Sequence, residues 1–150
     1  MDTLDERFMQ ALQAGGRAWQ KALERQLKTC GLTAAGWSAI AALAEMQRAA
    51  GEDARPPSQT ALAQHLGVDG ATLVATIDRL ANANLIERIP SRQDRRVKLV
   101  VLTQQGRQLE EKARAQADAL RREALARLDP GGLAVAAEVL EQLHQVLESA

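Results

Sequence analysis

Residues 86–106 restrict the possible folds of this chain more than any other segment. Two runs rich in Ile, Val and Leu flank a polar stretch that contains Arg92, Arg95 and Arg96, which is the pattern of a β-hairpin with a cationic tip. The surrounding sequence has the spacing of helices. Because a single short hairpin is only marginally stable in water, it must pack against helices. The chain is therefore expected to be mainly α-helical, with one hairpin supported by a helical body.

The segment before the hairpin has the signals of two short capped helices. After a loop over 49–57, Ser58 occupies the N-cap position of a helix that ends before Gly67. Asp69 then caps a second helix over 70–83. Such a pair forms either an ordinary helical hairpin or a helix-turn-helix, which places its second helix in the DNA major groove. The two short helices alone do not distinguish these alternatives.

Long amphipathic helices are expected at both ends of the chain. Apolar residues recur every three to four positions over 4–27, over a helix from Thr103 to Leu128, and over a last helix that starts at Asp129-Pro130. Another helix, capped by Thr33, is expected before the loop. The terminal apolar stripes need a partner, and a two-fold dimer supplies one. The order of elements is that of a winged helix-turn-helix embedded between long terminal dimerisation helices.

This order divides the chain into three parts. We expect an N-terminal dimerisation helix (1–31), a winged helix-turn-helix DNA-binding domain (32–102, with its wing at 86–102), and C-terminal dimerisation helices (103–150). No internal repeat or low-complexity linker interrupts them.

The charge is neutral in total but uneven along the chain. Between Arg88 and Lys98 five cations face only one acid, Asp94, while the formal net charge of the whole chain is zero. A local basic patch on a neutral protein favours selective binding of nucleic acid over general coating. The N-terminus has no apolar signal region and no run is long enough to span a membrane, so a cytoplasmic protein without a membrane partner is expected.

The sequence offers little for catalysis or metal binding. Cys30 is the only cysteine, and His65 and His144 have no ligand-type neighbours at a suitable spacing. No nucleophile–base arrangement or glycine-rich phosphate loop is present. We therefore expect no metal, no cofactor and no enzymatic activity.

Several short motifs together resemble the MarR family of bacterial transcriptional regulators. The matching residues are Leu32-Thr33 with Trp37, Thr60-Ala-Leu-Ala63, Val68-Asp69 with Thr72, Ile77-Asp-Arg-Leu80, Leu85-Ile-Glu-Arg88, Asp94-Arg95-Arg96, and Leu102-Thr103 with Gly106. The resemblance covers nearly the whole chain. It implies a homodimer that binds a pseudo-palindromic DNA operator, usually as a repressor, and that is released by a small anionic, aromatic or phenolic effector. It also implies sensing of cysteine oxidation in some members.

The chain departs from the family pattern in two places. Asn82-Ala-Asn84 stands where relatives often carry glycine, and Asn84 can adopt the left-handed conformation that this turn needs. The outward positions of the second helix are Gly70, Ala71, Val74 and Ala75, which offer few hydrogen bonds to bases. This apolar face leaves one alternative open beside the DNA-binding regulator, namely a winged-helix module that binds proteins or sequesters ligands without reading an operator.

The predicted DNA contacts lie in the helix-turn-helix and in the wing. The set is Ser58, Gln59, Thr60, Gly70, Ala71, Thr72, Val74, Ala75, Arg92, Arg95, Arg96 and Lys98. Ser58, Gln59 and Thr60 stand at a helix N-terminus, where they can cap the helix, bind phosphate or do both. One of the adjacent arginines, Arg95 or Arg96, is expected to pair with Asp94, because an unpaired acid in a DNA-facing loop opposes binding. By the family resemblance, Arg95 enters the groove and Arg96 is partly structural.

Two tryptophans suggest an effector site. Trp19 and Trp37 fit a helical core spacing, but the resemblance places their helices beside an effector cavity, with Arg17 or Arg25 available to a carboxylate. Both interpretations stay open. Cys30 is expected to be an inert small apolar residue, with an intersubunit disulfide as the alternative.

Overall fold

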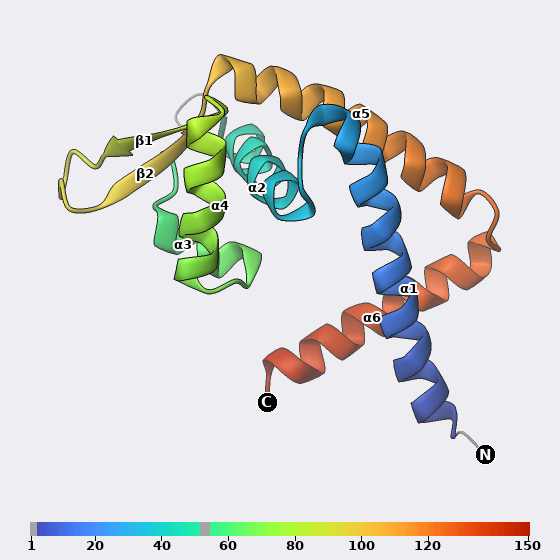
Figure 1. Ribbon diagram of the computed structural model, residues 1–150. Coiled ribbons are helices and arrows are strands. Elements are labelled where there is room, and N and C mark those ends of the chain that lie inside the picture. Colours follow the sequence, from blue (N-terminus) through green and yellow to red (C-terminus); the bar gives the residue numbers. More distant parts are fainter. Residues whose placement is uncertain (1–2, 52–54) are drawn as a thin grey trace. The chain divides into compact units, whose positions relative to one another are not determined.

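A computed structural model describes residues 3–51 and 55–150, and it has the expected mainly helical architecture (Figure 1). Its elements are α1 (Leu4–Leu27), a short 3-10 turn η1 (Lys28–Cys30), α2 (Ala34–Ala50), α3 (Gln59–Leu66), α4 (Gly70–Asn82), β1 (Ile86–Pro90), β2 (Lys98–Leu102), α5 (Gln104–Leu125) and α6 (Pro130–Glu148). The strands form an antiparallel hairpin in which Ile86 pairs with Leu102 and Pro90 with Lys98. The predicted fold class is confirmed.

The predicted N-caps form as expected because each depends on neighbouring residues only. The side chains of Thr33, Ser58, Asp69 and Asp129 each accept a hydrogen bond from a backbone amide three residues later. Gly67 ends α3 in the left-handed conformation, at a φ of 68°.

Two predicted boundaries are wrong by a few residues. α5 ends at Leu125 instead of Leu128, and the Leu128 amide donates back to the Leu125 carbonyl in a tight turn. The proline at position 130 makes such a stop favourable, because helical geometry is disfavoured before proline. α2 continues to Ala50, so the loop expected at 49–57 begins at Gly51. Residues 52–54 of that loop lie outside the described residues.

The core joins the helix-turn-helix to the hairpin and to the end of α1. Its most deeply buried side chains come from α1, α2, α3, α4 and β2, and they are Leu27, Ile40, Leu62, Ile77 and Val100. The amide of Val100 donates to the carbonyl of Pro57 at 2.9 Å, just before α3. The hairpin therefore packs against the helices, as its limited stability requires.

The chain forms two compact units, residues 1–117 and 118–150. The first contains the core, the helix-turn-helix, the hairpin and the first part of α5. The second contains the end of α5 and all of α6, whose apolar side chains are largely exposed. The assignment of both chain ends to dimerisation stays a prediction.

Candidate nucleic-acid interface

The N-terminus of α4 is closed by its own cap. The carboxylate of Asp69 accepts from the Thr72 amide at 2.8 Å and from the Thr72 hydroxyl at 2.7 Å. These two bonds hold the pKa of the Asp69 carboxyl below its usual value. The hydroxyl proton of Thr72 is thus directed at Asp69, which leaves the hydroxyl oxygen able to accept a hydrogen bond but not to donate one elsewhere.

The outward face of α4 is as apolar as the sequence indicates. Gly70, Ala71, Val74 and Ala75 are all exposed, and the Val74 side chain is 40% exposed. The opposite face packs into the core through Leu73, Ile77 and Leu80. Side chains of this kind contact a thymine methyl group but cannot make bidentate hydrogen bonds to a base pair.

The N-terminus of α3 combines capping with a tertiary contact. Ser58 Oγ accepts from the Ala61 amide at 3.0 Å, which confirms the capping interpretation. Gln59 Oε1 accepts from Arg88 Nε at 2.6 Å, and the side-chain amide nitrogen of Gln59 can still donate a hydrogen bond. Thr60 is exposed beside them.

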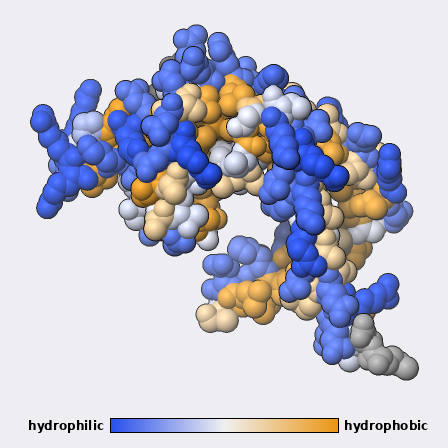
Figure 2. Space-filling model, in the orientation of Figure 1, coloured by the Kyte–Doolittle hydropathy of each residue, from blue (hydrophilic) through white to orange (hydrophobic). Residues whose placement is uncertain are grey.

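The hairpin tip presents exposed arginines from a defined turn. The Ser91 amide donates to the Val97 carbonyl at 2.9 Å and closes the end of the hairpin. Arg92, Arg95 and Arg96 are exposed at the tip, and the wing forms a hydrophilic projection in Figure 2. Lys98, at the start of β2, is exposed as well.

The expected pairing within the tip is confirmed. Arg96 donates to Asp94 from its backbone amide at 3.0 Å and from Nε at 3.2 Å. The Arg96 guanidinium, and next its amide, hold the pKa of the Asp94 carboxyl below its usual value. Among the described residues, no ion pair involves Arg92 or Arg95. These two arginines are therefore available to a phosphate or a groove.

Arg88 makes contacts between the wing and the helix-turn-helix that the sequence did not reveal. Besides its bond to Gln59, its guanidinium forms an ion pair with the carboxylate of Asp78 on α4. One side chain on β1 thus contacts the first residue of α3 and the exposed side of α4. These contacts link the wing to both helices of the helix-turn-helix. The local sequence carries no sign of it, because the three residues are far apart along the chain.

Two of the predicted effector residues pack against the core, and the other two are exposed on α1. Trp19 and Trp37 are half-buried and pack against the core, which supports the core interpretation. Arg17 and Arg25 are exposed on α1, where Arg17 borders an open surface groove together with Leu12. Their role in effector binding stays a prediction.

Other candidate groups are isolated. The Cys30 thiol is half-buried and donates to Gln116 Oε1 at 3.4 Å. Within residues 3–51 and 55–150, no cluster of His, Cys, Asp and Glu could hold a metal ion. No helix in these ranges is long and apolar enough to cross a membrane.

Comparisons with known proteins agree with this geometry. The sequence model of the MarR family matches residues 31–97. The solved structure of transcriptional regulator PA3341 is 32% identical, with a TM-score of 0.79, and the match covers 95% of this chain and 99% of that one. AbsC, a MarR family transcriptional regulator from Streptomyces coelicolor, is 25% identical over 100% and 99% of the two chains, with a TM-score of 0.81. CouR from Rhodococcus jostii RHA1, solved with p-coumaroyl-CoA bound, is 26% identical over 99% and 94%, with a TM-score of 0.74.

Capped helices α3 and α4 followed by the β1–β2 hairpin define a winged helix-turn-helix protein. The chain belongs to the MarR family of transcriptional regulators. Its relatives in these comparisons are transcriptional regulators.

Proposed function

We propose that this regulator binds a pseudo-palindromic DNA operator as a homodimer and represses transcription until a small anionic or aromatic effector releases it. In this proposal α4 enters the major groove and the wing enters the adjacent minor groove. The two half-sites of a two-fold dimer then lie about 10 base pairs apart, centre to centre. Residues 32–102 form the DNA-binding part, and residues 1–31 and 103–150 form the dimer interface.

The observation that carries this proposal is the exposed arginine tip of a wing that is linked to the helix-turn-helix through Arg88. Arg92 and Arg95 are exposed, while Arg88 ties the base of the wing to α3 and α4. A narrow minor groove concentrates negative potential and attracts inserted arginine. In this proposal the Arg88 contacts with Gln59 and Asp78 hold the wing in one position relative to α4. Such a fixed position is needed if α4 and the wing are to enter adjacent grooves together.

Sequence reading through α4 is expected to be limited. Its outward side chains suit methyl contacts and close approach of the helix backbone to DNA. Phosphate contacts from Gln59, Thr60 and Lys98 and groove contacts from the wing then carry much of the affinity. Steep salt dependence is expected, because each phosphate contact releases counterions.

The exposed apolar residues of the terminal helices support dimerisation. On α6, Val135, Val146 and Leu147 are 60%, 66% and 65% exposed, and Leu4 on α1 is 77% exposed. Figure 2 shows hydrophobic atoms along α6. Helices with this much uncovered apolar surface are stabilised by a second copy that buries them.

The effector part of the proposal draws on one relative. CouR has been solved with p-coumaroyl-CoA bound, a ligand with an aromatic body and anionic groups. A ligand of this general chemistry suits Arg17, Trp19, Arg25 and Trp37, as the sequence predicts. A titration of salicylate-like compounds, followed by tryptophan fluorescence and operator release, tests these residues, and a flat response in both signals argues against them.

Operator binding is tested by fluorescence anisotropy with duplex DNA from upstream of the protein's own gene. We expect saturable binding that resists competitor DNA, and a large loss of affinity in Arg95→Ala. Arg55→Ala is the matched control, because it removes the same charge from an exposed position that belongs neither to the predicted DNA contacts nor to the terminal helices. Binding that competitor DNA abolishes, or an equal loss in both variants, would favour the alternative of a protein-binding or ligand-sequestering module.

A further inference from the structure

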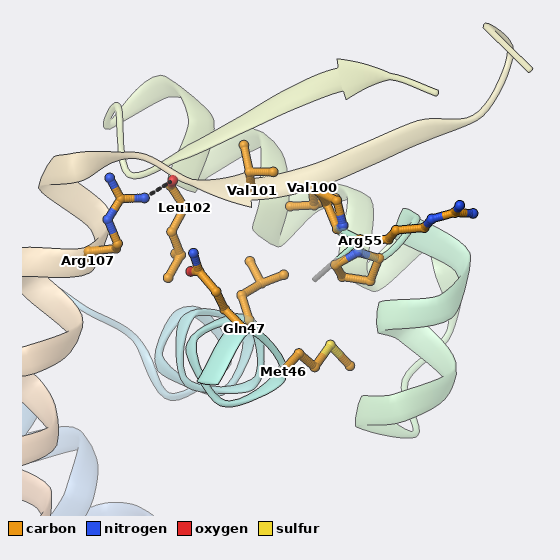
Figure 3. A pocket seen from close by; sticks show the side chains of 10 residues that line it. Met46, Gln47, Arg55, Val100, Val101, Leu102 and Arg107 are labelled. Atoms are coloured by element: carbon orange, nitrogen blue, oxygen red, sulfur yellow. Dashed lines mark hydrogen bonds between the residues drawn. The ribbon is translucent and has the colours of Figure 1, made fainter. Parts of the chain in front are cut away.

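A cavity of about 280 Å³ lies at the base of the wing (Figure 3). Its walls come from the second half of α2, from residues 55–57, from β2 and from the start of α5. None of the residues predicted to bind DNA or effector lines it. Its size is close to the lower end of the range for small-molecule pockets, about 300–1,000 Å³, which suits a ligand of one ring or a short chain.

The cavity has a polar end and an apolar end. Figure 3 shows the Gln47 amide and the Arg107 guanidinium beside Leu102, while Met46 lies toward the other end. The apolar wall includes Val100, which is almost fully buried at 1% exposure. This arrangement suits a ligand with an apolar body and one hydrogen-bonding, charged head.

The cation at the polar end retains donors for a ligand. Arg107 Nη1 donates to the Leu102 carbonyl at 3.2 Å, which uses one of the five N–H donors of a guanidinium. Within the described residues, no carboxylate forms an ion pair with Arg107. A planar guanidinium with free donors matches a carboxylate better than any neutral group.

We propose that this cavity binds a small apolar carboxylate, with its carboxylate on Arg107 and Gln47 and its body against Met46 and Val100. The site differs from the predicted effector residues on α1 and at the start of α2.

Binding here would act directly on the wing. β2 forms one wall of the cavity, and Val100 on that strand donates to Pro57, the residue before the N-cap of α3. A ligand between α2 and β2 therefore contacts the strand that joins the wing to the helix-turn-helix. By shifting this strand, the ligand changes the position of the wing and with it the operator affinity. This regulatory step rests on the proposed function, whereas the binding step does not.

The binding step is tested with benzoate on the full-length protein without DNA, by two-dimensional NMR and calorimetry. We expect saturable shifts centred on residues 100–102. Benzyl alcohol, which lacks the charge, and acetate, which lacks the apolar body, should each bind at least about tenfold more weakly, because each loses a main interaction. Absence of saturable shifts, or shifts centred on Trp19 and Trp37, would overturn the site.

Variants separate the assigned residues from general effects. Arg107→Gln should weaken benzoate binding about tenfold, since it removes a charge-assisted hydrogen bond. Arg55→Gln is the matched control, because Arg55 borders the same cavity but extends away from it in Figure 3. Met46→Trp, which fills the apolar end, should abolish binding while Arg107 is still present. An equal loss in Arg55→Gln, or normal binding in Met46→Trp, contradicts the proposal.

The regulatory step is measured separately, as operator affinity with and without benzoate. We expect benzoate to change the affinity of the wild type but not that of Arg107→Gln. If the protein binds benzoate but no operator, the proposed function fails and the site stands. If it binds both and benzoate leaves operator affinity unchanged, the coupling through β2 is wrong.

Discussion

Replacement of Arg88 by methionine tests whether the contacts of Arg88 with Gln59 and Asp78 hold the wing in place. The Arg88 side chain is 27% exposed and that of Asp78 is 55% exposed, so water screens their ion pair substantially. Such an exposed pair contributes about 0.2–1 kcal/mol, and the hydrogen bond from the charged Arg88 to Gln59 adds a similar or larger amount. Together we expect Arg88→Met to lower the free energy of unfolding by about 1–2 kcal/mol.

A double-mutant cycle with Asp78→Ala isolates the ion pair. Unfolding in urea, followed by circular dichroism, should give a coupling energy of about 0.5–1 kcal/mol between positions 78 and 88. A coupling energy below about 0.3 kcal/mol would mean that the pair does not stabilise the protein.

The same variants separate positioning from direct DNA contact. If Arg88 only positions the wing, Arg88→Met lowers operator affinity by several-fold and leaves the salt dependence unchanged. A lost phosphate contact instead reduces the slope of log K against log salt by about 0.9. The double variant Arg88→Met/Asp78→Ala removes one charge of each sign and controls for the net charge. A reduced slope in this double variant would refute the positioning role and identify Arg88 as a DNA contact.

Three further outcomes are expected. Gly106→Ala should destabilise the protein by at least about 2 kcal/mol in urea unfolding, since a Cβ there would overlap the Leu85 carbonyl oxygen; near-wild-type stability would contradict this packing. Folding lowers the pKa of Asp94, so the ionised carboxylate stabilises the folded protein. This contribution to the free energy of unfolding is complete above the pKa of the unfolded chain, about 4, and is lost as the pH falls below it toward the pKa of the folded state. Carboxyl NMR titration should show this pKa rising in Arg96→Ala, and an unchanged value would disprove the cause. Peroxide should affect DNA binding equally in wild type and Cys30→Ser, and a response confined to wild type would indicate a redox role.

The parts that were predicted correctly depend on residues close together in the sequence. Ser58 and Asp69 bond to amides three residues later, and Arg96 bonds to Asp94 two residues earlier. Asn84 takes the left-handed conformation, at a φ of 60°, that the turn after α4 requires. In each case the chemistry and the geometry lie within one turn of chain, so the local sequence contains the whole interaction.

The contacts that were missed join distant segments. Arg88 lies 29 positions from Gln59 and 10 from Asp78, and no periodicity or motif indicates which of the many surface arginines finds such partners. The cavity likewise needs α2, β2 and α5 to meet, which only the folded core brings about. The sequence also leaves Trp19 and Trp37 open between a core position and an effector site, and the folded chain packs both against the core.

The sequence by itself determined which segments are helices and where they are capped. It also determined that a cationic hairpin follows two short capped helices. All of these features follow from local hydrogen bonding and hydrophobic periodicity. It also carried the motifs of the MarR family. Only the tertiary structure decided how the wing is tied to the helix-turn-helix and where a cavity opens beneath it. Those features arise from side chains that packing brings together across the chain, and the burial that drives packing is non-directional, so it does not specify such pairs in advance.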